Sequence, residues 1–109
     1  MASLSTHVLD TARGTPASGI EVTLHLIGAA AREIARGTTD GDGRIAASFG
    51  GALAPGIYEL RFGVRAYFEK HKTSSLYDEV PVRFTIAVEE HYHVPLLLSP
   101  FGYSTYRGS

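Results

Sequence analysis

The chain has 109 residues, 44% of them apolar, which suits one domain with a modest core. Ten basic and eleven acidic residues give a formal net charge of −1, which argues against a nucleic-acid partner or binding to an anionic membrane. Cysteine is absent, which excludes disulfides and thiol catalysis, and no membrane-spanning run or signal-peptide pattern is evident, so we expect a cytoplasmic protein.

Short runs of alternating apolar and polar residues, separated by glycine-rich turns, indicate an all-β chain. The clearest turn signal is the Asp-Gly-Asp-Gly stretch at residues 40–43. The expected strands, in chain order, cover residues 4–10, 20–26, about 32–38, a short run from about Ile45, a run after the Pro-Gly turn at 55–56, residues 80–88, 92–98 and the tail.

One segment breaks the alternation. The sequence VRAYFEKHK at residues 64–72 has no period of two and predicts a short helix of about two turns. About eight strands at this spacing, with one short helix, predict a two-sheet sandwich that uses residues 1–109 as a single domain.

Alternation also predicts which side chains point away from the core. In HYHVPLLL, the set Tyr92, Val94, Leu96 and Leu98 forms the apolar face, so His91 and His93 lie on the other face. His7 shares a face with Ser5 opposite the more interior Val8, and Tyr106 lies opposite Arg107 in the tail. If these strands are neighbours, they form a polar, titratable patch on the outside of one sheet.

Each of these residues also has a structural interpretation. We expect His25 and His71 to be solvated surface residues, and Arg44 and Tyr106 are compatible with an ordinary turn and an edge strand. His91 and His93 resemble half of a metal site, but zinc normally takes three or four ligands and no third is evident, so no metal is expected. From the residues alone, the chemistry stays open.

Three stretches together resemble a known family. LSTHVLDTARGTPASGI at residues 4–20, TDGDGR at 39–44 and HYHVPLLLSPFGYSTYRGS at 91–109 are similar to the transthyretin-like 5-hydroxyisourate hydrolases of urate breakdown. The terminal YRGS is the most specific piece, because it separates these hydrolases from the transthyretin hormone carriers. The resemblance spans essentially the whole chain.

The resemblance implies a fold, an assembly and a site. The fold is a transthyretin-like sandwich of two four-stranded sheets with a short helix, and the assembly is a homotetramer, a dimer of dimers. The first strand and the last two share a sheet whose outer face lines a channel between dimers. The family's catalytic positions fall on His7, Arg44 and His93, the substrate-contacting set on His7, Arg44 and Tyr106, and Ser109 is a further candidate.

The implied reaction opens a ring of 5-hydroxyisourate with water and gives 2-oxo-4-hydroxy-4-carboxy-5-ureidoimidazoline. Histidine suits the proton transfers because its pKa is near neutral, and arginine offers fixed donors for oxygen atoms of the substrate. No metal or organic cofactor is expected. The alternative function is a carrier that holds a small aromatic ligand in the channel without converting it.

Overall fold

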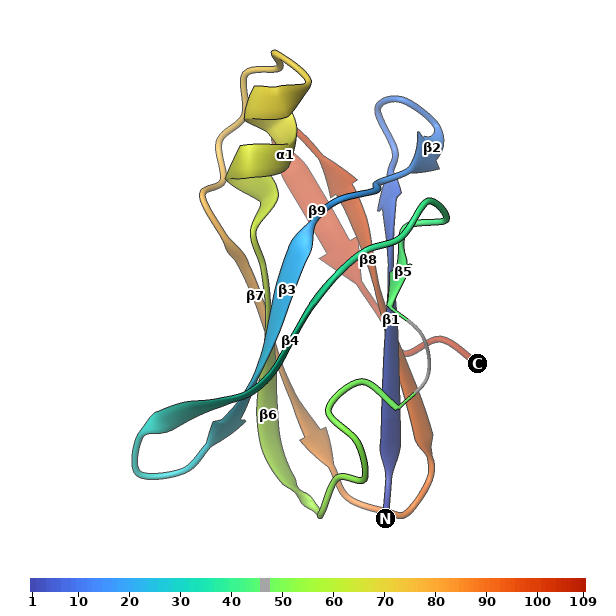
Figure 1. Ribbon diagram of the computed structural model, residues 1–109, viewed down its shortest axis with the longest axis vertical. Helices are drawn as coiled ribbons and strands as arrows, with labels where there is room; N and C mark the ends of the chain where they lie inside the picture. Colours follow the sequence, from blue (N-terminus) through green and yellow to red (C-terminus); the bar gives the residue numbers. More distant parts are fainter. Residues whose placement is uncertain (46–47) are drawn as a thin grey trace.

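The computed structural model describes residues 1–45 and 48–109, whose strands form two sheets packed face to face (Figure 1). The first sheet has the order β2-β1-β8-β9, with β5 also paired to β1, and the second has the order β4-β3-β6-β7. The elements are β1 (Ser3–Asp10), β2 (Thr15–Pro16), β3 (Glu21–Ile27), β4 (Ala31–Thr38), β5 (Arg44–Ile45), β6 (Gly56–Phe62), α1 (Val64–Lys70), β7 (Val80–Ile86), β8 (His91–Ser99) and β9 (Gly102–Thr105).

The all-β sandwich with one short helix is therefore confirmed. The first sheet holds one more strand than the resemblance implies, and the additional strand is β2. After β1 the chain turns back, so that Pro16 pairs with Leu9 and Thr15 pairs with Asp10. The short strand expected from about Ile45 corresponds to β5, and residues 46–47, which that expectation also covered, lie outside the described residues. Within the described residues, no helix is long and apolar enough to cross a membrane.

The core lies between the sheets, where the inward side chains of both meet. The expected apolar face of β8 is buried throughout, and alternate residues of β1 are buried from Leu4 to Asp10. The largest fully buried side chains are Phe62, Phe68, Leu4, Ile20, Leu24, Leu60, Ile86, Leu96 and Leu98. This packing leaves the intervening residues of β1 and β8 on the outer face of their sheet.

The helix α1 closes one end of the sandwich (Figure 1). Its buried residues, Val64, Tyr67 and Phe68, follow the helical spacing of three and four. The Tyr67 hydroxyl donates to Oδ2 of the buried Asp10 at 2.7 Å, which ties the helix to the end of β1. Burial and the bond to Asp10 raise the pKa of Tyr67 to about 12, so this phenol stays protonated as a donor.

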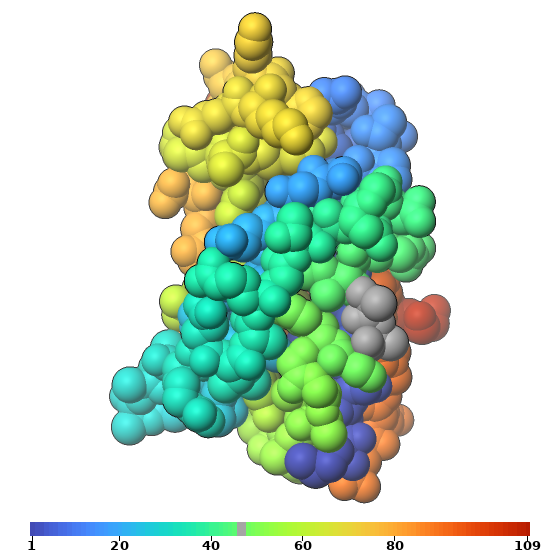
Figure 2. All heavy atoms as spheres, viewed as in Figure 1, coloured from blue at the N-terminus to red at the C-terminus, as the bar shows by residue number. Residues whose placement is uncertain are grey.

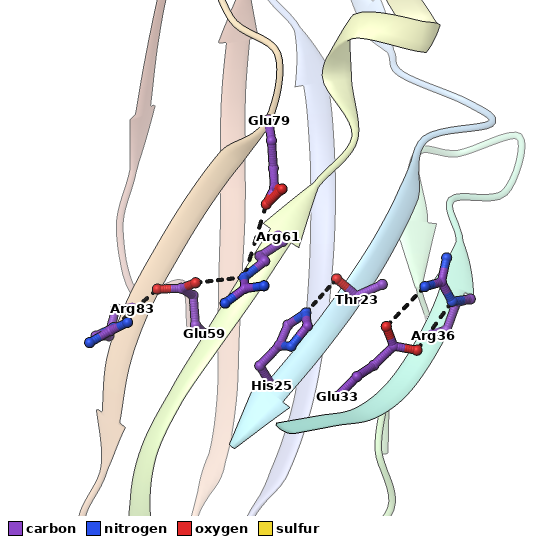
Figure 3. A network of polar contacts seen from close by, with 8 residues as sticks. All are labelled: Thr23, His25, Glu33, Arg36, Glu59, Arg61, Glu79 and Arg83. Atoms are coloured by element: carbon purple, nitrogen blue, oxygen red, sulfur yellow. Dashed lines mark hydrogen bonds and ion pairs between the residues drawn. The ribbon is translucent and has the colours of Figure 1, made fainter. Parts of the chain in front are cut away.

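His25 is buried, with 8% of its surface exposed, so the expectation of a solvated residue is wrong. Its strand is central, with Glu33 and Glu59 as register partners on either side, and the β3–β4 register shifts between Leu24 and His25. Long charged side chains from both neighbouring strands flank the ring, which bonds Thr23 at 2.8 Å (Figure 3). The expectation failed because it ignored this cross-strand cover.

Candidate active site

A cavity of about 270 Å³ opens on the outer face of the first sheet, beside the point where β5 joins β1. It contains Arg44, His93 and Ser109, three of the site residues that the family resemblance implied, together with His91. Figure 2 shows the carboxyl-terminal residues, in red, at the edge of the molecule. The full lining is Ser5, Thr6, Arg44, Ile45, His91, His93 and Ser109.

Arg44 is placed by a tight turn. The Asp40 carboxylate accepts the backbone N–H of Asp42 at 2.8 Å and that of Arg44 at 3.0 Å, and these bonds hold the pKa of Asp40 below its usual value. Gly43 has φ +73°, and a side-chain carbon there would lie 2.5 Å from the Val8 carbonyl oxygen. The turn thus packs directly on β1 and sets Arg44 opposite His7.

His93 reaches the same face from β8. The two strands run parallel, with Ser5 paired to His93 and His7 to Pro95, so the face carries serines and histidines in alternation with buried residues. The Ser5 hydroxyl lies 2.8 Å from Nδ1 of His93 and 2.9 Å from Nε2 of His91. The His93 ring is therefore held through one nitrogen.

The charge state of His93 follows from this setting. Burial lowers the pKa of His93, and repulsion from Arg44 and from the protonated forms of His7 and His91 lowers it further. His93 is therefore neutral at pH 7 and available as a proton acceptor. His7 acts electrostatically on His93 from the same face of the sheet, although the His7 side chain does not line the cavity in the single chain.

The tail is fastened beside the site beyond the end of β9. The Gly108 N–H donates to the His93 carbonyl at 2.7 Å, and the Arg107 guanidinium lies 4.2 Å from the centroid of the Tyr92 ring. Arg107 also bonds Glu90 at 3.0 Å. These contacts bring Ser109 to the cavity, which the sequence suggested only through the resemblance.

Tyr106 lies outside this group. It is 56% exposed and lines a separate groove that also includes Tyr92 and Arg107. The expected alternation of Tyr106 and Arg107 along a strand is wrong, because β9 ends at Thr105. The predicted contact of Tyr106 with substrate stays a prediction. Sequence reasoning also missed Ser5 as a partner of His93, although alternation already placed it on the face of His7.

A larger cavity, of about 520 Å³, lies over the outer face of the other sheet (Figure 3). Its arginines are paired: Arg36 with Glu33, Arg65 with Asp78, and Arg61 with Glu59, which does not itself line the cavity. The bond from Arg61 is the main reason for the lowered pKa of Glu59. Since these charges are already neutralised by pairing, the size of this cavity does not make it the stronger candidate.

Comparison with known proteins shows what the chain resembles. A model of the HIUase/Transthyretin family matches residues 4–108. A curated 5-hydroxyisourate hydrolase from Mesorhizobium japonicum is 46% identical, over 97% of this chain and 91% of that protein. The structure of Klebsiella pneumoniae 5-hydroxyisourate hydrolase has a TM-score of 0.90 and 38% identity, over 100% of this chain and 94% of that chain. Sea bream transthyretin in complex with thyroxine has a TM-score of 0.85 and 30% identity, over 96% and 93% of the two chains.

Proposed function

Because this chain belongs to the HIUase/transthyretin family, we propose that it is a hydrolase of 5-hydroxyisourate whose active site is the cavity at Arg44 and His93. The reaction places the enzyme in purine catabolism. The observation that supports this site best is the convergence of three segments far apart in the sequence. Register pairs His7 with Arg44 across β1 and β5, and pairs Ser5 with His93 across β1 and β8.

The chemistry assigns a role to each group. Water attacks a ring carbonyl carbon, a histidine takes the proton of the water, and the ring C–N bond breaks as the leaving nitrogen gains a proton. His7 and His93 share these proton transfers, and the lowered pKa of His93 favours its neutral, proton-accepting form. Arg44 holds oxygen atoms of the substrate and stabilises the negative charge that develops on the attacked carbonyl. The product is 2-oxo-4-hydroxy-4-carboxy-5-ureidoimidazoline.

The proposed working form is a homotetramer, a dimer of dimers, in which the outer face of the first sheet lines a channel. This proposal is supported by the position of β1, β8 and β9 in one sheet and by the open, polar character of its outer face. Tyr106 is the proposed contact for the substrate from the tail. The cytoplasmic location and the absence of a metal or organic cofactor stay predictions.

A carrier is the second candidate, because the likeness to transthyretin in complex with thyroxine covers most of the chain. An aromatic-ligand carrier has no need for two histidines and an arginine on one face. The test generates 5-hydroxyisourate from urate and follows the decay of its absorbance with and without the protein. Faster decay in proportion to protein concentration supports the hydrolase. An unchanged decay rate with the protein present rejects it.

A further inference from the structure

Four side chains form one hydrogen-bonded row along the outer faces of β1 and β8. The Ser3 hydroxyl lies 2.7 Å from Nδ1 of His91, and the Ser5 hydroxyl lies 2.9 Å from Nε2 of the same ring. Ser5 continues the row to Nδ1 of His93, 2.8 Å away. Both nitrogens of His91 are therefore engaged. Among the described residues, His93 has a side-chain partner at Nδ1 alone, so its Nε2 remains for substrate or water.

The row follows from the parallel pairing of the two strands. Ser3 is the register partner of His91, and Ser5 is the register partner of His93. Since side chains alternate, all four project from the same face, and each serine reaches the ring beside it. The row runs along the lining of the cavity, from the exposed His91 to the half-buried His93.

We propose that Ser5 and His91 are positioning residues for His93, fixing its ring through Nδ1 and relaying the proton of that nitrogen toward solvent. This inference rests on the proposed hydrolysis for its role in turnover. The hydrogen-bonded row itself does not depend on that reaction. Neither residue is assigned a direct contact with the substrate.

A single hydroxyl proton makes the row directional. Ser5 has one proton, so it can donate to one ring only, and the relay requires that it accept from the other. If His93 carries its proton on Nδ1, Ser5 accepts it and donates to Nε2 of His91, which then carries its own proton on Nδ1. If His93 carries its proton on Nε2, Ser5 donates to Nδ1 of His93 and accepts from Nε2 of His91. The relay therefore requires matching tautomers in the two neutral rings.

The relay balances without a further reactant. When Nε2 of His93 takes a proton from water, its Nδ1 proton moves to Ser5, and the Ser5 proton moves to Nε2 of His91. His93 is then neutral again, and the positive charge lies on the exposed His91. The reverse sequence returns the proton for the leaving nitrogen. Moving the charge outward is favourable because burial of the ring, and then the charge of Arg44, disfavour a positive charge on His93.

Nitrogen-15 NMR of the histidine rings in the intact protein near pH 8 reads these tautomers directly, and needs no substrate. We expect matching tautomers for His91 and His93 in the wild type. Ser5→Ala should uncouple them, and Ser5→Thr, which keeps a hydroxyl, should restore the match. Ser3→Ala is the matched control, because it removes a hydroxyl from the same row without touching His93. Opposite tautomers in the wild type overturn the proposal without recourse to any variant.

A double-mutant cycle on turnover tests the link to catalysis. Ser5→Ala and His91→Gln should each lower kcat by about tenfold, the scale of one hydrogen bond. The double variant should lose no more than either single one, because both changes break the same row. Losses that multiply overturn the relay. A wild type that does not hydrolyse 5-hydroxyisourate instead rejects the proposed function, and the tautomer measurement then still decides whether the row exists.

Discussion

Arg44 is the direct register partner of His7, across the short antiparallel pair formed by β5 and β1. Backbone contacts fix this relationship. The turn before Arg44 is closed by the Asp40 carboxylate, and the Gly43 carbonyl accepts the Val8 N–H at 2.7 Å. The guanidinium is therefore placed at the site by its backbone position, before any substrate contact forms.

Gly43→Ala tests this dependence. The added carbon would lie 2.5 Å from the Val8 carbonyl oxygen, at a φ of +73° that disfavours a side chain. We expect a loss of more than about 1 kcal/mol in the free energy of unfolding. We also expect turnover to fall by up to about a hundredfold as Arg44 is displaced. Denaturant unfolding and steady-state kinetics measure the two effects.

Gly41→Ala is the matched control in the same turn, because nothing lies within 4 Å of a side-chain carbon at this position. It should keep wild-type stability and turnover within about twofold. Equal losses in the two variants would show that the turn tolerates no substitution at all, and that the contact with β1 is not the cause.

Gly108 in the tail, like Gly43 in the turn, packs too closely on its neighbours to leave room for a side chain. A side-chain carbon there would lie 2.5 Å from Cδ2 of His93, so Gly108→Ala should move either the tail or the imidazole. We expect kcat to fall by about tenfold or more while the unfolding free energy changes by under about 1 kcal/mol. Gly102→Ala, whose nearest contact would be 3.6 Å away at Ser99, is the control. Unchanged kcat in Gly108→Ala would separate the tail from the chemistry.

The lowered pKa of His93 predicts two effects of pH. Activity should persist below pH 6.5, the usual value for histidine, because the neutral ring survives to lower pH. Folding stability should fall as pH drops from about 6.5 toward the folded-state pKa, because the unfolded chain binds that proton more readily. Both effects have the same origin in burial and neighbouring positive charge.

NMR titration of His93 in Arg44→Gln isolates one part of that cause. Removing the Arg44 charge should raise the pKa of His93, whereas Arg36→Gln, which removes a charge paired with Glu33 on the other sheet, should leave it unchanged. The same pKa in all three proteins would mean that the Arg44 charge does not reach the ring.

Much of this arrangement could be predicted from local patterns. Alternation predicted the outward faces of β1 and β8, and the Asp-Gly-Asp-Gly sequence predicted the turn before Arg44. The hydrogen bonds of Ser5 could not be predicted, because they depend on the parallel register of strands more than eighty residues apart. The burial of His25 was missed because it depends on long side chains from neighbouring strands. The substrate contact predicted for Tyr106 depends on the proposed assembly of four chains.

Assembly is tested by mass. The proposed channel requires four chains, so sedimentation or light scattering should give about four times the chain mass of 11.7 kDa. Activity per chain should fall on dilution once the tetramer dissociates. A monomer with full activity at micromolar concentration would contradict the channel and the proposed role of Tyr106 within it.

The most direct test of the whole account is the rate at which 5-hydroxyisourate decays with His7→Asn, His93→Asn and Arg44→Lys, each at the same concentration of folded protein. The site residues project from the core, so the variants should fold, and each histidine variant should lose about 10²–10⁴-fold in turnover. Arg44→Lys should also lose activity, since an ammonium does not reproduce the planar guanidinium. His71→Asn, at the far end of α1, should retain nearly wild-type turnover. Equal rates for the wild type and His93→Asn would contradict the assignment of this cavity as the active site.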